Sequence, residues 1–208
     1  VDIVVANAGI QLDNAFAHVV SGRSCDLFTI LGVAGVGKSR LAREFLVGLD
    51  ATVVTGRCLS YGEGISYWPV TEVVKQLVPG GEVAGPLASI LGEEAAPGSP
   101  EEIAWAFRKL LEARAAEEPL VCIFDDIQWG EETFLDLVEH VADLSRDAPI
   151  LMLCMARPEL LDRRPGWAGG KVNATTVLLE ALDRREVDLM IETLGDLGDD
   201  EQGVLDRQ

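Results

Sequence analysis

The residues best suited to chemistry lie between positions 32 and 40, where glycines precede a lysine and a serine. Gly32-x-x-x-x-Gly37-Lys38-Ser39 matches the full pattern of a phosphate-binding P-loop. Glycines let the backbone curl so that several N–H groups point at phosphate oxygens, and the positive end of the following helix strengthens that field. The pattern predicts that Lys38 contacts the β- and γ-phosphates, where it also acts catalytically, and that the Ser39 hydroxyl binds Mg²⁺. We assign nucleotide binding to Gly32, Gly35, Val36, Gly37, Lys38, Ser39 and Arg40.

Two carboxylates follow the apolar run Leu120–Phe124 and supply a second acidic element. A Mg²⁺ ion at a P-loop needs a further oxygen shell, usually reached through water, and we predict that Asp125 provides it. Asp126 is then placed to polarise the water that attacks the γ-phosphate.

An arginine comes just after another apolar run, Ile150–Met155. In an open α/β sheet the carboxyl end of a strand faces the ligand crevice. The position therefore predicts that Arg157 senses the γ-phosphate as a third catalytic residue, with a surface arginine that caps a strand as the alternative.

The elements that must position these residues alternate between β-rich runs and helical patterns. The second to fourth β-rich runs are nearly all apolar, which is typical of strands buried on both faces. This alternation predicts an α/β fold with a mostly parallel sheet covered by helices on both faces. The expected strands are Leu27–Leu31, Thr52–Thr55, Leu120–Phe124, Ile150–Met155 and Thr175–Leu179, and the expected helices are Ser39–Leu49, Glu101–Ala116 and Glu131–Leu144.

One helix start is marked especially well. Ser99 can cap the helix, Pro100 suits its first turn, and Glu102 completes a capping box. The glycine- and proline-rich stretches Pro79–Pro100 and Arg163–Asn173 are expected to be loops.

Composition restricts the partners and the compartment. The 208 residues include 17 Lys and Arg against 35 Asp and Glu, a formal charge of -18. Nucleic-acid binding depends on clustered basic residues, so we expect no direct contact with nucleic acid. No apolar run approaches the roughly 20 residues of a membrane span. The four cysteines are too widely spaced for a zinc site and are expected to be reduced core thiols, which favours the cytoplasm.

The P-loop, the acidic element and the later arginine, in this order, resemble the STAND branch of the AAA-related P-loop ATPases, the signal-transduction ATPases with numerous domains. The likeness is strongest to the module found beside class III adenylyl or guanylyl cyclase domains and in large LuxR-type transcriptional regulators. It covers roughly Leu12 to Leu194. The segments that carry it are Ala15–Arg23, Cys25–Gly32, Gly56–Cys58, Tyr61–Pro69, Asp125–Trp129 and Ala156–Leu160.

The resemblance implies a P-loop three-layer sandwich with a five-stranded sheet in the order 5-1-4-3-2. It also implies Mg-ATP binding, nucleotide-dependent self-association, and a cyclase or DNA-binding output domain in a longer chain. On this basis residues 1–22 are a lead-in segment, 23–180 are the ATPase core, and 181–208 begin a helical lid that continues beyond Gln208.

This sequence departs from the family pattern in ways that affect turnover. Val1–Ile10 replaces the usual start that helps to seat adenine, so the choice between adenine and guanine stays open. Gln128 stands where the family has histidine. With an incomplete lid, we expect weak binding of ADP and ATP and slow hydrolysis.

Three functions therefore compete. The first is an ATP-hydrolysing regulatory switch. The second is an ATP-binding and assembly module with little turnover. The third is a small-molecule kinase, suggested by the paired basic residues Arg163 and Arg164.

Overall fold

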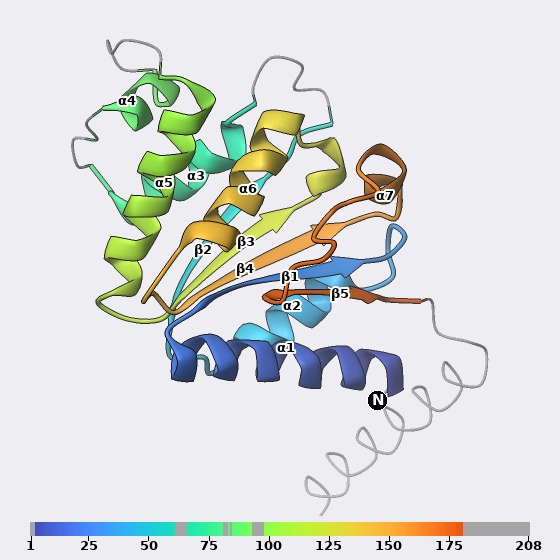
Figure 1. Cartoon of the computed structure of the whole chain (residues 1–208). Helices are drawn as coiled ribbons and strands as arrows, with labels where there is room; N and C mark the ends of the chain where they lie inside the picture. Colours follow the sequence, from blue (N-terminus) through green and yellow to red (C-terminus); the bar gives the residue numbers. More distant parts are fainter. Residues whose placement is uncertain (1–2, 61–65, 81–82, 84, 93–97, 181–208) are drawn as a thin grey trace, which may run out of the picture.

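Five parallel strands form one sheet at the centre of the molecule (Figure 1). The structure is a computed structural model that describes residues 3–60, 66–80, 83, 85–92 and 98–180. The sheet order is β2-β3-β4-β1-β5, which confirms the expected order 5-1-4-3-2. Every neighbouring pair is parallel. The strands are β1 (Cys25–Leu31), β2 (Thr52–Arg57), β3 (Leu120–Asp125), β4 (Ile150–Ala156) and β5 (Ala174–Leu178).

The strand register brings the predicted functional segments to one edge of the sheet. Leu31 pairs with Ala156, and Arg57 pairs with Asp125. In a parallel sheet the carboxyl ends of neighbouring strands meet, so the segments after β1, β3 and β4 emerge together.

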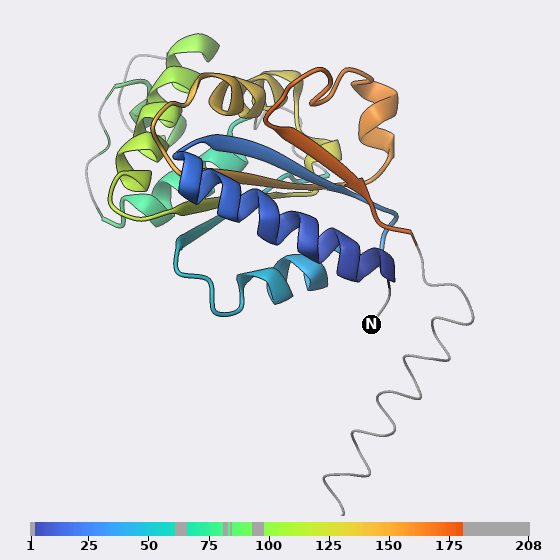
Figure 2. The same ribbon diagram turned by 60° about the horizontal axis from the view of Figure 1, so that its bottom comes forward.

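Helices cover both faces of the sheet and complete three layers (Figure 2). One face carries α1 (Ile3–Gly22) and α2 (Lys38–Leu46), and the other carries α3 (Trp68–Leu77), α5 (Pro100–Ala115) and α6 (Glu132–Leu144). The short helices α4 (Pro86–Ile90) and α7 (Glu159–Arg163) and the 3-10 turn η1 (Ile127–Trp129) lie in the connections. No helix in the described ranges combines the length and the apolar character that a membrane span needs.

Side chains alternate between two cores, one on each face of the sheet. In β3, Cys122 and Phe124 pack towards α5 and α6, whereas Val121 and Ile123 pack towards α1 and α2. β3 is buried along almost its whole length and β4 throughout, as their apolar runs predicted. The expectation that β2 is buried on both faces was wrong. It is an edge strand, and residues such as Val53 (38% exposed) face solvent although the run reads as apolar.

The helix boundaries follow the sequence signals closely. Ser99 accepts a hydrogen bond from the Glu102 N–H, and the Glu102 side chain accepts one from the Ser99 N–H, so the predicted capping box forms. α2 ends three residues earlier than expected, before Gly48, whose φ of 76° is left-handed. A short helix, α4, interrupts the expected loop Pro79–Pro100.

In the predicted lead-in segment, residues 3–22 form the long helix α1, whose Leu12 and Val19 are buried against the sheet. The predicted lid at 181–208 lies outside the described residues. The four cysteines are buried free thiols, as expected.

Candidate functional site

The P-loop joins the end of β1 to the start of α2 and depends on its glycines. Gly35 and Gly37 have φ values of 81° and 106°, which favour glycine. A Cβ atom on Gly32 would lie 2.7 Å from the Val36 side chain and 3.0 Å from the Leu179 carbonyl oxygen, so this position has no room for one. Gly37 is the N-cap of α2 and provides no side-chain cap. The first N–H groups of α2 therefore keep their capacity to bind an anion.

The lysine of the loop folds back onto its own backbone. Lys38 Nζ donates hydrogen bonds to the carbonyl oxygens of Gly32, at 2.6 Å, and Val33, at 3.1 Å. These bonds hold the ammonium group over the loop, where it can exchange carbonyl oxygens for phosphate oxygens.

The two carboxylates stand at the end of β3 in different conformations. Asp125 is the last residue of the strand, and its Oδ1 accepts a hydrogen bond of 2.9 Å from the Asp126 N–H. Asp126 is left-handed, with φ 57° and ψ 36°, an uncommon backbone conformation outside glycine. This turn follows β3 directly, so both carboxylates stand at the same edge of the sheet.

An open pocket of about 360 Å³ gathers most of the predicted residues. Gly32 and Val36, which were predicted to bind nucleotide, are not among its lining residues. Arg157, immediately after β4, does line it. Ala34 and Arg57 join the predicted set, which gives the lining residues Ala34, Gly35, Gly37, Lys38, Ser39, Arg40, Arg57, Asp125, Asp126 and Arg157.

Two residues at this site were not predicted to act there. Arg57, at the end of β2, donates two hydrogen bonds to Asp126 Oδ2, at 3.2 Å from Nε and 2.7 Å from Nη2. Gln128 is 4% exposed; its Nε2 donates to Asp126 Oδ1 at 3.0 Å, and its Oε1 accepts from the Arg157 N–H at 3.0 Å. An arginine at the end of a β-rich run was the available signal for Arg57, by the argument applied to Arg157.

The paired arginines that suggested a kinase lie elsewhere. In the described part of the chain, neither Arg163 nor Arg164 is among the residues that line this pocket. Both form ion pairs with carboxylates on α6 instead.

Burial and neighbouring charges shift the pKa values of the ionisable groups in the pocket. Burial lowers the pKa of Lys38, against the opposing effect of the charges on Asp126 and Asp125. Burial and the negative charge of Asp126 raise the pKa of Asp125. Burial alone would raise the pKa of Asp126, but hydrogen bonds from Gln128 and Arg57 and the charge of Arg57 lower it overall. The two carboxylates therefore differ in proton affinity, and Asp125 holds a proton more readily than Asp126.

The parallel sheet, the P-loop between β1 and α2, and the acidic end of β3 together define a P-loop nucleoside-triphosphatase fold. The family model of the AAA ATPase domain matches residues 10–153. This chain belongs to that family. No curated protein matches the sequence.

Solved structures share the fold at low sequence identity. The Aeropyrum pernix ORC1 protein in complex with DNA is 12% identical, with a TM-score of 0.60 over 92% of this chain and 49% of that one. The Drosophila ORC bound to DNA is 13% identical, with a TM-score of 0.51 over 87% of this chain and 44% of that one. This chain therefore spans about half the length of either, and the likeness establishes the fold.

Proposed function

We propose that this domain binds and slowly hydrolyses Mg-ATP, and that it acts as a nucleotide-dependent switch for an attached output domain. The observation that carries the proposal is the single pocket that holds the P-loop, both carboxylates and Arg157. A phosphate cradle, oxygen ligands for a hard cation and an acidic group near the same space are what phosphoryl transfer to water requires.

The oxygen ligands suit magnesium. Ser39 offers a hydroxyl and Asp125 a carboxylate into the same pocket, and Mg²⁺ prefers such oxygen donors completed by phosphates and water. When bound, the ion would neutralise charge on the phosphates. Its positive charge would also favour the ionised form of Asp125, whose pKa burial raises.

The other residues divide the work of orientation and proton transfer. The ammonium group of Lys38 leaves its carbonyl partners to bind the β- and γ-phosphates. Asp126, ionised near neutral pH because its pKa is lowered, accepts a hydrogen bond from the attacking water. Arg157 senses the γ-phosphate from the end of β4.

A second candidate function is an ATP-binding module with little turnover. A specific contact favours it, because Arg57 and Gln128 occupy both carboxylate oxygens of Asp126. In this arrangement the water-activating group is engaged by the protein, and hydrolysis requires the ion pair with Arg57 to open.

Two measurements test the proposal. Calorimetry with and without Mg²⁺ should show ATP binding that depends on the metal. An assay of phosphate release should show slow hydrolysis of ATP. Binding without release would favour the second candidate. If ATP does not bind at all, both candidates are wrong. Parallel titrations with GTP would establish the base preference.

We further propose that the domain belongs to the STAND subgroup, self-associates with nucleotide bound, and acts in the cytoplasm on a cyclase or DNA-binding output domain. Two of the structures that share the fold are described as DNA complexes. The formal charge of -18 leads us to propose that any contact with DNA belongs to an output domain. Light scattering with ADP and ATP would test the self-association.

A further inference from the structure

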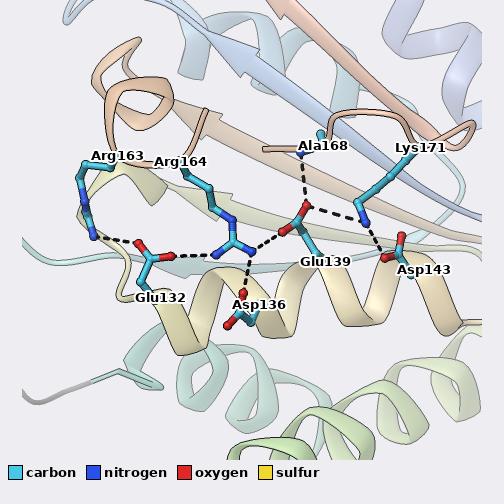
Figure 3. Close-up of polar contacts among 8 residues, drawn as sticks. All are labelled: Glu132, Asp136, Glu139, Asp143, Arg163, Arg164, Ala168 and Lys171. Carbon is cyan, nitrogen blue, oxygen red and sulfur yellow. Dashed lines mark hydrogen bonds and ion pairs between the residues drawn. The ribbon is translucent and has the colours of Figure 1, made fainter. Parts of the chain in front are cut away.

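Arg163 connects the end of α7 to the turn that follows the two site carboxylates. Its Nη1 donates a hydrogen bond of 2.6 Å to the Gln128 carbonyl oxygen, and its Nη2 donates one of 3.2 Å to the Gly130 carbonyl oxygen. Figure 3 shows the same guanidinium reaching Glu132 at the start of α6, an ion pair of 3.6 Å. The planar fork of an arginine suits two carbonyl groups at once, so Arg163 can fix both position and orientation of η1.

The turn that Arg163 holds carries Gln128, whose side chain lies between two candidate site residues. Its carboxamide donates to Asp126 Oδ1 and accepts from the Arg157 N–H, and the residue is 4% exposed. Rotating this amide would leave buried polar groups without partners, which costs free energy. In this one orientation Gln128 bridges Asp126, which follows β3, and the Arg157 N–H, which follows β4.

We infer that Arg163 is a positioning residue that acts on the site through Gln128. By fixing the backbone of η1, it holds the carboxamide that orients the carboxylate of Asp126 and the backbone at Arg157. This inference rests on the proposed function, since it assigns Asp126 and Arg157 to the reaction. Arg163 itself is not among the residues that line the pocket, and its described bonds reach no nucleotide-binding residue of the P-loop.

The next residue in the chain provides a matched control. Arg164 binds carboxylates along α6, at 2.9 Å from Glu132 and 2.6 Å from Asp136, and also contacts Glu139. Figure 3 shows these bonds side by side with the contacts of Lys171 to Glu139 and Asp143. These contacts fasten the segment after α7 to α6 without passing through the turn η1. Loss of Arg164 should therefore affect stability more than turnover.

The kinetic test compares Arg163→Met, Arg163→Lys, Gln128→Leu, the double variant Arg163→Met/Gln128→Leu, and Arg164→Met. We expect Arg163→Met to lower kcat by about tenfold to a hundredfold, the range for residues that orient a reacting group. KM for Mg-ATP should stay within about twofold, because the phosphate loop is untouched. Arg163→Lys should recover part of kcat, since lysine can reach one carbonyl. The double variant should be no slower than Gln128→Leu, because the two residues act in series.

A second measurement needs no turnover. In the wild type the two Nε2 protons of Gln128 should exchange slowly with water, and NMR can measure this rate. The exchange is slow because the residue is 4% exposed and Nε2 donates a hydrogen bond to Asp126. Arg163→Met and Arg163→Lys should accelerate that exchange, and Arg164→Met should not. If the wild type binds ATP without hydrolysing it, the proposal of ATP hydrolysis is wrong. The rate of Gln128 proton exchange then tests the positioning role of Arg163 by itself. Arg163→Lys gives the same readout if Arg163→Met does not fold.

Three results would overturn the inference. One is wild-type kcat and unchanged Gln128 exchange in a folded Arg163 variant. Another is multiplication of the two single-variant losses in the double variant, which would mean independent action. The third is an equal loss of kcat in Arg164→Met, which would make the effect a general consequence of loosening the segment after α7.

Discussion

Arg57 donates two hydrogen bonds to one carboxylate oxygen of Asp126, so replacing it with methionine would free that oxygen for water. If the ion pair restrains hydrolysis, Arg57→Met should accelerate it. The same change should raise the pKa of Asp126, because the hydrogen bonds and the charge of Arg57 help to lower it. A more basic and more accessible carboxylate is a better acceptor for the proton of the attacking water.

The size of the effect follows from the exposure of the pair. The side chain of Arg57 is 62% exposed and that of Asp126 is 21% exposed, so solvent screens their attraction. Such pairs contribute about 0.2–1 kcal/mol. The free energy of unfolding should fall by that amount, with a decrease in Tm of at most about 2–4 °C for a domain of this size. If the pair must open before water is activated, the same energy corresponds to an increase in kcat of up to about fivefold.

The stability difference has a defined pH dependence. Because the folded-state pKa of Asp126 is lowered, its ionised form stabilises the fold above the unfolded value of about 3.9, and this contribution is lost as pH falls through the folded value. The free energies of unfolding of wild type and Arg57→Met should therefore differ by the full amount at neutral pH and become equal in strong acid. The acid limb of kcat should move to higher pH in the variant.

Phosphate release at saturating Mg-ATP, followed from neutral pH into strong acid, measures kcat and its acid limb, and thermal unfolding over the same range measures stability. Arg43→Met serves as the control, because Arg43 is an exposed arginine on α2 that does not line the pocket. A folded Arg57→Met variant with lower kcat and unchanged ATP affinity would refute the argument. It would show that Arg57 supports hydrolysis.

Further predictions concern the P-loop, the carboxylates and the capping box. Lys38→Ala should weaken ATP binding by about 2–5 kcal/mol, or roughly thirtyfold to several-thousandfold, by calorimetry. Its Tm should change little because Lys38 bonds to carbonyls of a surface loop; unaltered ATP affinity would contradict the site. Asp125→Asn should weaken the Mg²⁺ dependence of binding, whereas Asp126→Asn should keep affinity within a few-fold and abolish phosphate release. Wild-type hydrolysis in Asp126→Asn would exclude its catalytic role. Ser99→Ala should lower the free energy of unfolding by about 1 kcal/mol in urea titrations, and an unchanged midpoint would mean that the cap contributes nothing.

The sequence by itself determined the fold class, all five strands in kind and position, and the location of the P-loop. These features depend on local signals. A strand buried on both faces needs a continuous apolar run, as in β3 and β4, and a left-handed turn favours glycine, as at Gly35 and Gly37. The capping box at Ser99 is equally local, because both partners lie three residues apart.

Tertiary structure alone decided which residues surround Asp126. Arg57 is 69 residues away in the chain and reaches the carboxylate because β2 and β3 pair in a particular register. Gln128 lies close to Asp126 in sequence, but its orientation also depends on a second partner, the Arg157 N–H, which follows the neighbouring strand β4. The edge position of β2 was implied by the resemblance, through the order 5-1-4-3-2, but not by the apolar residues of the strand itself, since exposure depends on what lies beside a strand. Hydrophobic pattern and turn chemistry act over a few residues, whereas ion pairs and buried hydrogen bonds between distant segments depend on how the whole sheet assembles.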